Sequence, residues 1–163
     1  LAPLIDGGGQ ERGRRNGTEN TAGFVAMAKA LRLVKQNEKQ AVEREKAIKT
    51  RIYDHIKNFE HVEVISQNDD SFAPHILTFA IVGVRGETIV HAFEDHDIYI
   101  STTSACSSKK HVEAGTLAAM KVPDEIATSA VRISLGDQNT LAEADEFNRV
   151  FDELYAGFKK IID

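Results

Sequence analysis

Apolar residues recur at three- and four-residue steps over residues 21–59, and this pattern constrains the fold more than any other feature of the sequence. The spacing predicts one long helix. Because such a length exceeds the usual range for a globular domain, we expect the helix to link two domains. The apolar signal weakens over residues 37–40, which predicts a bend or a change of packing partner there. The apolar positions include Phe24, Ala28, Leu31, Val42, Ile48, Ile52, Ile56 and Phe59.

The chain beyond this pattern alternates between strand and helix signals. Strands are expected at 62–65, 76–82, 98–100 and 131–135, and helical segments at 86–94, 112–120, from Pro123 and from Thr140. Thr140 and Glu143 fit a capping box, which predicts where the last helix begins. The core-facing stripe of that helix would comprise Leu141, Ala144, Phe147, Phe151, Leu154, Phe158 and Ile161. Strands separated by helices indicate an α/β fold in which helices cover a small sheet.

The opening stretch, residues 1–20, is rich in glycine and polar residues and predicts an irregular loop. The chain begins with Leu1 instead of Met, and Ala2-Pro3 then leads into a glycine run. We therefore expect a piece of a longer protein or a processed chain. The alternative is a trimmed form of a small protein.

Composition excludes several classes of protein. The 163 residues carry 20 Lys and Arg against 25 Asp and Glu, a net charge of −5, which argues against direct nucleic-acid binding. No apolar run approaches the ~20 residues needed to span a bilayer, and no signal peptide is recognisable. One cysteine cannot form an internal disulfide, which favours a reducing, cytoplasmic location. The six histidines form no recognisable ligand pair, so no metal site is predicted.

Cys106 lies among small polar residues at 101–108, with Lys109, Lys110 and His111 directly after them. Small polar residues predict a mobile, solvated loop, and nearby cations favour the reactive thiolate. The alternative is a small buried apolar side chain, since free cysteine is commonly buried. The flanking composition favours the reactive thiol.

Two further residues are candidate ligand contacts. Arg132 alternates with Val131 and Ile133 and would face away from the core, where a guanidinium on a rigid strand suits a carboxylate. A solvated surface arginine fits the spacing equally well. The loop ending at Thr18 precedes a helix, whose free amides can hold phosphate. It lacks the Lys-Thr ending of a Walker A loop.

Three segments together resemble the C-terminal part of a cysteine desulfurase. They are GGGQERGRRNGTEN at 7–20, SACSS at 104–108 and AVRISLG at 130–136, and their order and spacing match along essentially the whole chain. These enzymes are pyridoxal-phosphate-dependent members of the class V aminotransferase superfamily. The long form of the cysteine loop is similar to the NifS/IscS-type branch.

The resemblance implies a fold and a domain division. The fold would be the small C-terminal domain of a fold-type I pyridoxal-phosphate enzyme, with a small, mainly antiparallel sheet covered by helices. Residues 1–20 would belong with the large cofactor domain, residues 21–59 would form the linking helix, and residues 60–163 would form the small domain.

The resemblance also implies residue roles. Cys106 matches the loop cysteine that takes the substrate sulfur as a persulfide, and Arg132 matches the arginine that binds the substrate carboxylate. Thr18 matches the threonine that reaches the cofactor phosphate of the other subunit in a homodimer. The reaction would convert L-cysteine to L-alanine. The persulfide would pass to an acceptor such as an iron–sulfur scaffold or a tRNA-thiolation enzyme.

The sequence departs from the family pattern at two places. Asn16 stands where the family usually has serine, and Thr102-Thr103 precede Ser104 where serine-glycine is common. The family's cofactor lysine would lie upstream of Leu1, so we expect the chain alone to be inactive and to bind no pyridoxal phosphate productively. Three alternatives remain open: a class V aminotransferase-fold enzyme without thiol chemistry, a non-catalytic interaction domain, and a degenerate homologue.

Overall fold

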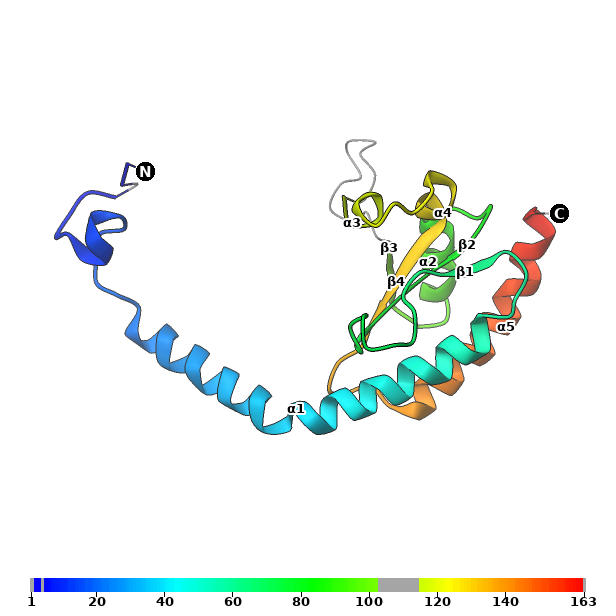
Figure 1. Ribbon diagram of the computed structural model, residues 1–163, viewed down its shortest axis with the longest axis horizontal. Helices are drawn as coiled ribbons and strands as arrows, with labels where there is room; N and C mark the ends of the chain where they lie inside the picture. Colours follow the sequence, from blue (N-terminus) through cyan, green and yellow to red (C-terminus); the bar gives the residue numbers. More distant parts are fainter. Residues whose placement is uncertain (1, 4, 103–114, 163) are drawn as a thin grey trace. The chain divides into compact units, whose positions relative to one another are not determined.

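The computed structural model describes residues 2–3, 5–102 and 115–162 and divides into two compact units, Leu1–Lys39 and Gln40–Asp163 (Figure 1). The long helix α1 (Thr21–Ile56) contributes to both. The predicted helix over 21–59 is therefore present and ends three residues early. It stays helical through residues 37–40, where the apolar signal weakens, and the boundary between the units falls in this stretch.

The first unit contains the glycine-rich loop, a short 3₁₀ helix η1 (Gln10–Gly13) and the first part of α1. This part of α1 has a largely exposed surface. Its exposed large apolar side chains are Phe24, Val25, Met27, Leu31, Leu33 and Val34. The core of the described residues is built in the second unit.

The second unit is built on a four-stranded antiparallel sheet in the order β1-β2-β4-β3. The strands are β1 (Val62–Val64), β2 (Ile76–Ile81), β3 (Ser101–Thr102) and β4 (Ala130–Ser134). The helices of this unit besides α1 are α2 (Gly86–Glu94), α3 (Gly115–Ala119), α4 (Asp124–Ser129) and α5 (Leu141–Ile162). The expected α/β fold with a small antiparallel sheet is confirmed. None of the helices within the described ranges combines the length and apolarity needed to cross a membrane.

The strand predicted at 98–100 is wrong. Ile98 and Ile100 pack on the core and Tyr99 is exposed, so burial alternates as in a strand. Strand pairing begins only at Ser101, because Asp97 adopts a left-handed turn (φ 59°) and the Ile98 amide donates back to the Phe93 carbonyl. Burial alternation therefore does not by itself distinguish a paired strand from an extended segment.

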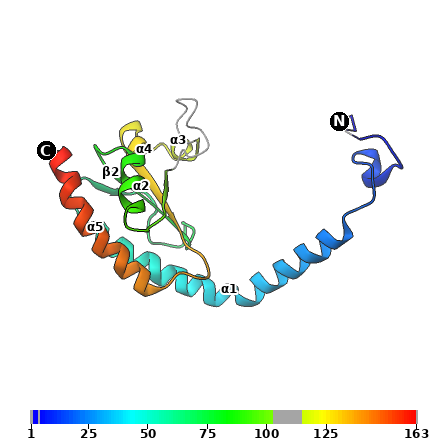
Figure 2. The same cartoon turned by 180° about the vertical axis from the view of Figure 1, so that it is seen from behind.

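The main core lies between one face of the sheet and the helices α1, α2 and α5. Figures 1 and 2 both show α5 running beside the second half of α1 under the sheet. Stacked and edge-to-face aromatic rings join these layers, with Phe93 and Phe147 parallel at 4.9 Å and Phe59 and Phe151 at 5.1 Å between ring centroids. Among the described residues, the opposite face carries a smaller cluster built on Ala80, Leu117 and Ala130.

The helix α5 begins as its sequence predicts. The Thr140 amide donates to Glu143 Oε2 at 2.6 Å, and the Glu143 amide donates to Thr140 Oγ1 at 3.3 Å, which confirms the capping box. The predicted apolar stripe is buried in its middle, but Leu141 and Ile161 at its ends are exposed.

Lys49 of α1 is a buried cation that fixes the turn between β1 and β2. Its side chain is 2% exposed, and its Nζ donates to the carbonyls of Gln67 at 2.9 Å and Ala73 at 3.2 Å. Burial lowers the pKa of Lys49. The two carbonyls compensate the buried ammonium and hold the turn against α1.

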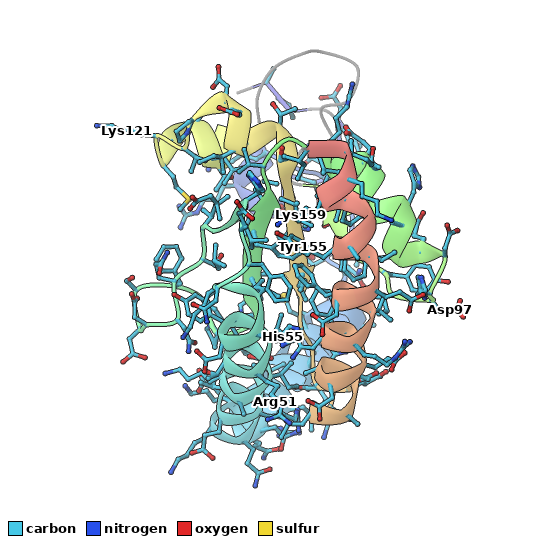
Figure 3. The ribbon with its side chains drawn as sticks, turned by 90° about the vertical axis from the view of Figure 1, so that its right-hand side faces the viewer. Arg51, His55, Asp97, Lys121, Tyr155 and Lys159 are labelled. Atoms are coloured by element: carbon cyan, nitrogen blue, oxygen red, sulfur yellow. The ribbon has the colours of Figure 1, made fainter. Side chains whose placement is uncertain are left out.

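Polar and ionic contacts join α1 and the turn after it to α5 along their exposed side (Figure 3). Arg51 donates to Asp145 through Nε at 2.6 Å and through Nη2 at 3.3 Å, and His55 Nε2 lies 2.7 Å from Asp152 Oδ1. Further along, the contacts reach Glu60: Tyr155 donates to its carbonyl at 2.6 Å and Lys159 binds its carboxylate at 2.8 Å. These contacts fix the register of the two helices, while the aromatic core beneath them supplies most of the stabilisation.

The Arg51–Asp145 pair predicts a pH dependence of stability. The hydrogen bonds and charge of Arg51 lower the pKa of Asp145, so the folded state favours the carboxylate. The stabilisation is present above the unfolded pKa of about 3.9 and is lost as the pH falls through the lower folded pKa. We expect Asp145→Asn to flatten the acid limb of the stability curve, measured as thermal midpoint from about pH 7 to 3.

Arg51→Gln should flatten the same limb, because it removes the cause of the shift. The double variant Arg51→Gln/Asp145→Asn should add nothing further, since both changes break one contact. Acid limbs that run parallel in the wild type and Asp145→Asn would contradict this assignment.

Candidate functional site

Arg132 lies in the middle of the open face of the sheet. It pairs with Thr78 of β2 on one side and with Ser101 of β3 on the other. Directly opposed residues of antiparallel strands share a face, so these three side chains form a row across three strands. Thr78 is buried at 7% exposure, whereas Arg132 is exposed. The sequence prediction for β4 is confirmed, because Val131 and Ile133 are buried in the core and Arg132 faces away.

The guanidinium of Arg132 has no counter-charge among the residues that the structure describes. Within residues 5–102 and 115–162 it makes no ion pair and no side-chain hydrogen bond. The small cluster with α3 and α4 covers the Ala80–Ala130 end of this face. A cation on a rigid strand, with its five N–H donors unpaired, can bind a carboxylate through two parallel hydrogen bonds.

Cys106 lies outside the described residues, which stop at 102 and resume at 115. The sequence places it four residues after Thr102, the last residue of β3. The strand β3 is the neighbour of β4 at Arg132, through the pair Ser101↔Arg132. In the sequence, the strand residue that pairs with Arg132 therefore precedes Cys106 by five positions.

Thr18 belongs to the first unit and lies two residues before Asn20, which caps α1. Asn20 Oδ1 accepts a hydrogen bond from the Gly23 amide at 3.0 Å, as an N-cap residue does. The Thr18 carbonyl accepts from Arg15 Nη1 at 3.2 Å. Thr18 is exposed, and its hydroxyl makes no hydrogen bond to any residue in the described part of the chain. It is a free donor next to a helix start.

The loop before Thr18 is more ordered than the predicted irregular loop. Glu11 and Arg12 have left-handed backbone (φ 51° and 60°), and Gly17 has φ 104°, a conformation that favours glycine. The Gly13 amide donates to the Gly9 carbonyl at 3.0 Å and closes the turn. The loop is thus a compact turn, and Thr18 follows it just before the start of α1.

A hollow of about 530 Å³ in the second unit is a feature that sequence analysis missed. The apolar residues that line it include Ile133 and Phe147, and the polar residues that line it include His96, Asp97 and Glu143. The residues come from α1, the segment after α2, β4 and α5, so no local pattern in the sequence could reveal it. Within residues 5–102 and 115–162, no group of three or more His, Cys, Asp or Glu side chains is placed to hold a metal ion.

Comparison with known proteins shows the family. The family model for class V aminotransferases matches residues 7–147. The chain belongs to the class V aminotransferase family. The match includes both Thr18 and Arg132, so the loop in the first unit and the sheet in the second both lie within the region that the family model matches.

Individual relatives of this class V chain are named NifS or IscS proteins. The chain is 58% identical over 161 residues to a NifS/IcsS protein homolog of Lactobacillus delbrueckii subsp. bulgaricus, covering 99% of this chain and 42% of the relative. It is 35% identical over 144 residues to the cysteine desulfurase IscS of Clostridium botulinum, covering 87% and 36%. The chain therefore spans about two fifths of the length of these relatives.

Solved structures show the same similarity. A NifS-like protein superposes with a TM-score of 0.75 at 30% identity, covering 96% of this chain and 39% of that one. A NifS-like protein from Rickettsia africae gives 0.76 at 26% identity, covering 94% and 40%. The antiparallel sheet and its helices are thus a fold that this class V chain shares with NifS-like proteins.

Proposed function

We propose that this class V chain is the C-terminal part of a pyridoxal-phosphate-dependent cysteine desulfurase. The whole protein would convert L-cysteine to L-alanine and form a persulfide on Cys106. The observation that carries the proposal is Arg132, an exposed guanidinium on the open sheet face that has no counter-charge among residues 5–102 and 115–162. The relatives named cysteine desulfurases support the substrate class.

Arg132 binds the carboxylate of the substrate in this proposal. Its fork of N–H groups matches the two carboxylate oxygens, and its place on β4, between β2 and β3, limits its motion. Two hydrogen bonds to the carboxylate fix the orientation of the substrate, and with it the direction in which the thiol group points. Arg132 thus orients the substrate for the reaction at its sulfur atom.

Thr18 fits the family's cofactor. Its exposed hydroxyl has no hydrogen-bond partner among the residues that the structure describes, and it is available to donate to a phosphate oxygen. In the proposed homodimer this phosphate belongs to the cofactor of the other subunit. Pyridoxal phosphate supplies an electron sink at the substrate when it is bound.

Cys106 is the sulfur acceptor. Its thiolate attacks the substrate sulfur, an S–S bond forms as the C–S bond of the substrate breaks, and the freed carbon takes up a proton. Overall, L-cysteine and the Cys106 thiol give L-alanine and the Cys106 persulfide, so atoms balance without an external oxidant. The cations Lys109 and Lys110 favour the thiolate that this attack requires.

The remaining assignments follow from the same proposal. Residues 1–20 belong with a large cofactor domain, residues 21–59 contain the linking helix, and residues 60–163 form the small C-terminal domain. The Cys106 persulfide then passes its sulfur to a second protein, such as an iron–sulfur scaffold or a tRNA-thiolation enzyme. The lone cysteine favours a cytoplasmic location. The 163-residue chain alone is inactive, because the cofactor lysine lies elsewhere in the whole protein.

The test supplies the whole protein with pyridoxal phosphate and L-cysteine. We expect L-alanine to form and the peptide containing Cys106 to gain the mass of one sulfur atom, which a thiol reductant removes. Alanine without this mass gain would favour a class V enzyme without thiol chemistry. Neither product, combined with capture of a sulfur-acceptor protein, would favour a non-catalytic interaction domain.

A further inference from the structure

Asn16 is a buried polar residue inside the exposed glycine-rich loop. Its side chain is 7% exposed, while most of its neighbours in the loop are exposed. Both polar atoms of its amide group are bonded: Nδ2 donates to the Ile5 carbonyl at 2.6 Å, and Oδ1 accepts from the Gly9 amide at 2.6 Å. One side chain therefore ties the end of the loop to two points near its beginning.

The packing around Asn16 is as close as its hydrogen bonding. A Cβ atom added to Gly7 would lie 3.0 Å from the Asn16 Cβ, which is closer than ordinary van der Waals contact. The backbone at Gly7 can lie against Asn16 because glycine has no side chain. Asn16 thus fills the centre of the loop.

The backbone that follows Asn16 is held on both sides. The Gly17 amide donates to Gln10 Oε1 at 3.1 Å, and Arg15 Nη1 donates to the carbonyls of Gly17 at 3.1 Å and Thr18 at 3.2 Å. These contacts are exposed and individually weak, because water competes for the same groups. The Asn16 side chain is buried and its two hydrogen bonds are part-buried, so they contribute more than the exposed contacts to keeping the loop closed.

We propose that Asn16 is a positioning residue, which closes the loop over residues 5–17 and thereby holds the Thr18 hydroxyl where it meets the cofactor phosphate. The inference rests on the proposed function for the role of Thr18. The family usually has serine at this position, and a serine hydroxyl is too short to reach both partners of Asn16 in this loop. An amide reaches both, with its donor on one side and its acceptor on the other.

Loop closure is tested first on this chain, without cofactor. Trypsin cleaves after arginine only where the backbone can become extended, and Arg12, Arg14 and Arg15 lie inside the closed turn. We expect Asn16→Ala to speed cleavage at these bonds about tenfold, because two part-buried hydrogen bonds are lost. Gly7→Ala should do the same by displacing Asn16. Asn37→Ala is the matched control, an exposed asparagine on α1 whose loss should change nothing.

Positioning is tested next on the whole, cofactor-loaded protein, by the rate of pyridoxal phosphate release. Asn16→Ala should speed release about tenfold, and Asn16→Asp should fall between it and the wild type, because a carboxylate keeps the acceptor and loses the donor. Thr18→Val should speed release without speeding cleavage. This difference separates the residue that closes the loop from the residue that binds phosphate.

The outcomes are distinguishable. Unchanged cleavage in Asn16→Ala overturns loop closure by this side chain. Faster cleavage with unchanged cofactor release overturns the positioning role and leaves the proposed function standing. A wild-type whole protein that retains no pyridoxal phosphate overturns the proposed function, and the positioning role with it.

Discussion

Replacing Arg132 with glutamine in the whole protein is expected to lower kcat/KM for L-cysteine by about 100-fold. Two charge-assisted hydrogen bonds to the proposed substrate carboxylate are lost, and at about 1.5 kcal/mol each, the low end of their usual range, they account for a loss of this size. Glutamine is uncharged, so the substitution also removes a positive charge from the open face of the sheet. The measurement is the steady-state rate of alanine formation over a range of cysteine concentrations.

Two controls make this prediction specific. Arg132→Lys keeps the charge and loses the fork, so we expect an intermediate loss of about tenfold. Arg85→Gln removes an exposed arginine of the same unit, which contacts Glu87 at 3.5 Å, and should leave kcat/KM unchanged.

The decisive comparison uses cysteamine, which is cysteine without its carboxylate. The wild type and Arg132→Gln should process it at the same low rate, because the group that Arg132 binds is missing. An equal proportional loss on both substrates would show that the arginine acts on the fold or on another group, and would contradict carboxylate binding.

The orientation of Arg132 could be predicted because it follows from alternation within β4. Val131 and Ile133 must face the core, and this fixes Arg132 on the other face. Its neighbours could not be predicted, because Thr78 and Ser101, which pair with Arg132 across the sheet, lie far away in the sequence. A local pattern predicts where a side chain points, and tertiary pairing decides what it meets.

The loop illustrates the same limit. The sequence identified Thr18 as the candidate ligand contact of this loop, but its glycines predicted an irregular loop where the structure has a compact turn. The closure by Asn16 could not be predicted, because its hydrogen bonds to Ile5 and Gly9 arise only when the left-handed residues bring these groups together. The only signal was that Asn16 departs from the family's usual serine.

The strand expected at 98–100 was wrong for a related reason. Apolar alternation reports burial, and both a paired strand and an extended segment on a core produce it. The turn at Asp97 and the short β3 decide between them, and neither has a strong local signature. The long helix and the capping box were predicted well because their signals are local.

Phe151→Ala is expected to lower the free energy of unfolding of this chain by about 3–5 kcal/mol, the usual cost of removing a buried phenylalanine. The side chain is 1% exposed, and its ring lies 5.1 Å from Phe59, 6.0 Å from Phe79 and 5.9 Å from Tyr155. It therefore joins α5 to the turn after α1 and to β2. Urea unfolding followed by circular dichroism measures the change.

The matched control is Phe24→Ala, the same change on the first unit's part of α1, where Phe24 is 50% exposed. We expect a loss below about 0.5 kcal/mol, since little apolar contact disappears. A loss below about 1 kcal/mol for Phe151→Ala would contradict the packing of Phe151 in this core.

The same core supports β4 and hence Arg132. The Phe151 variant should therefore bind the carboxylate while it is folded and lose this binding when it unfolds. Arg132→Gln should show the opposite behaviour, with binding lost at every temperature and the stability of the fold unchanged.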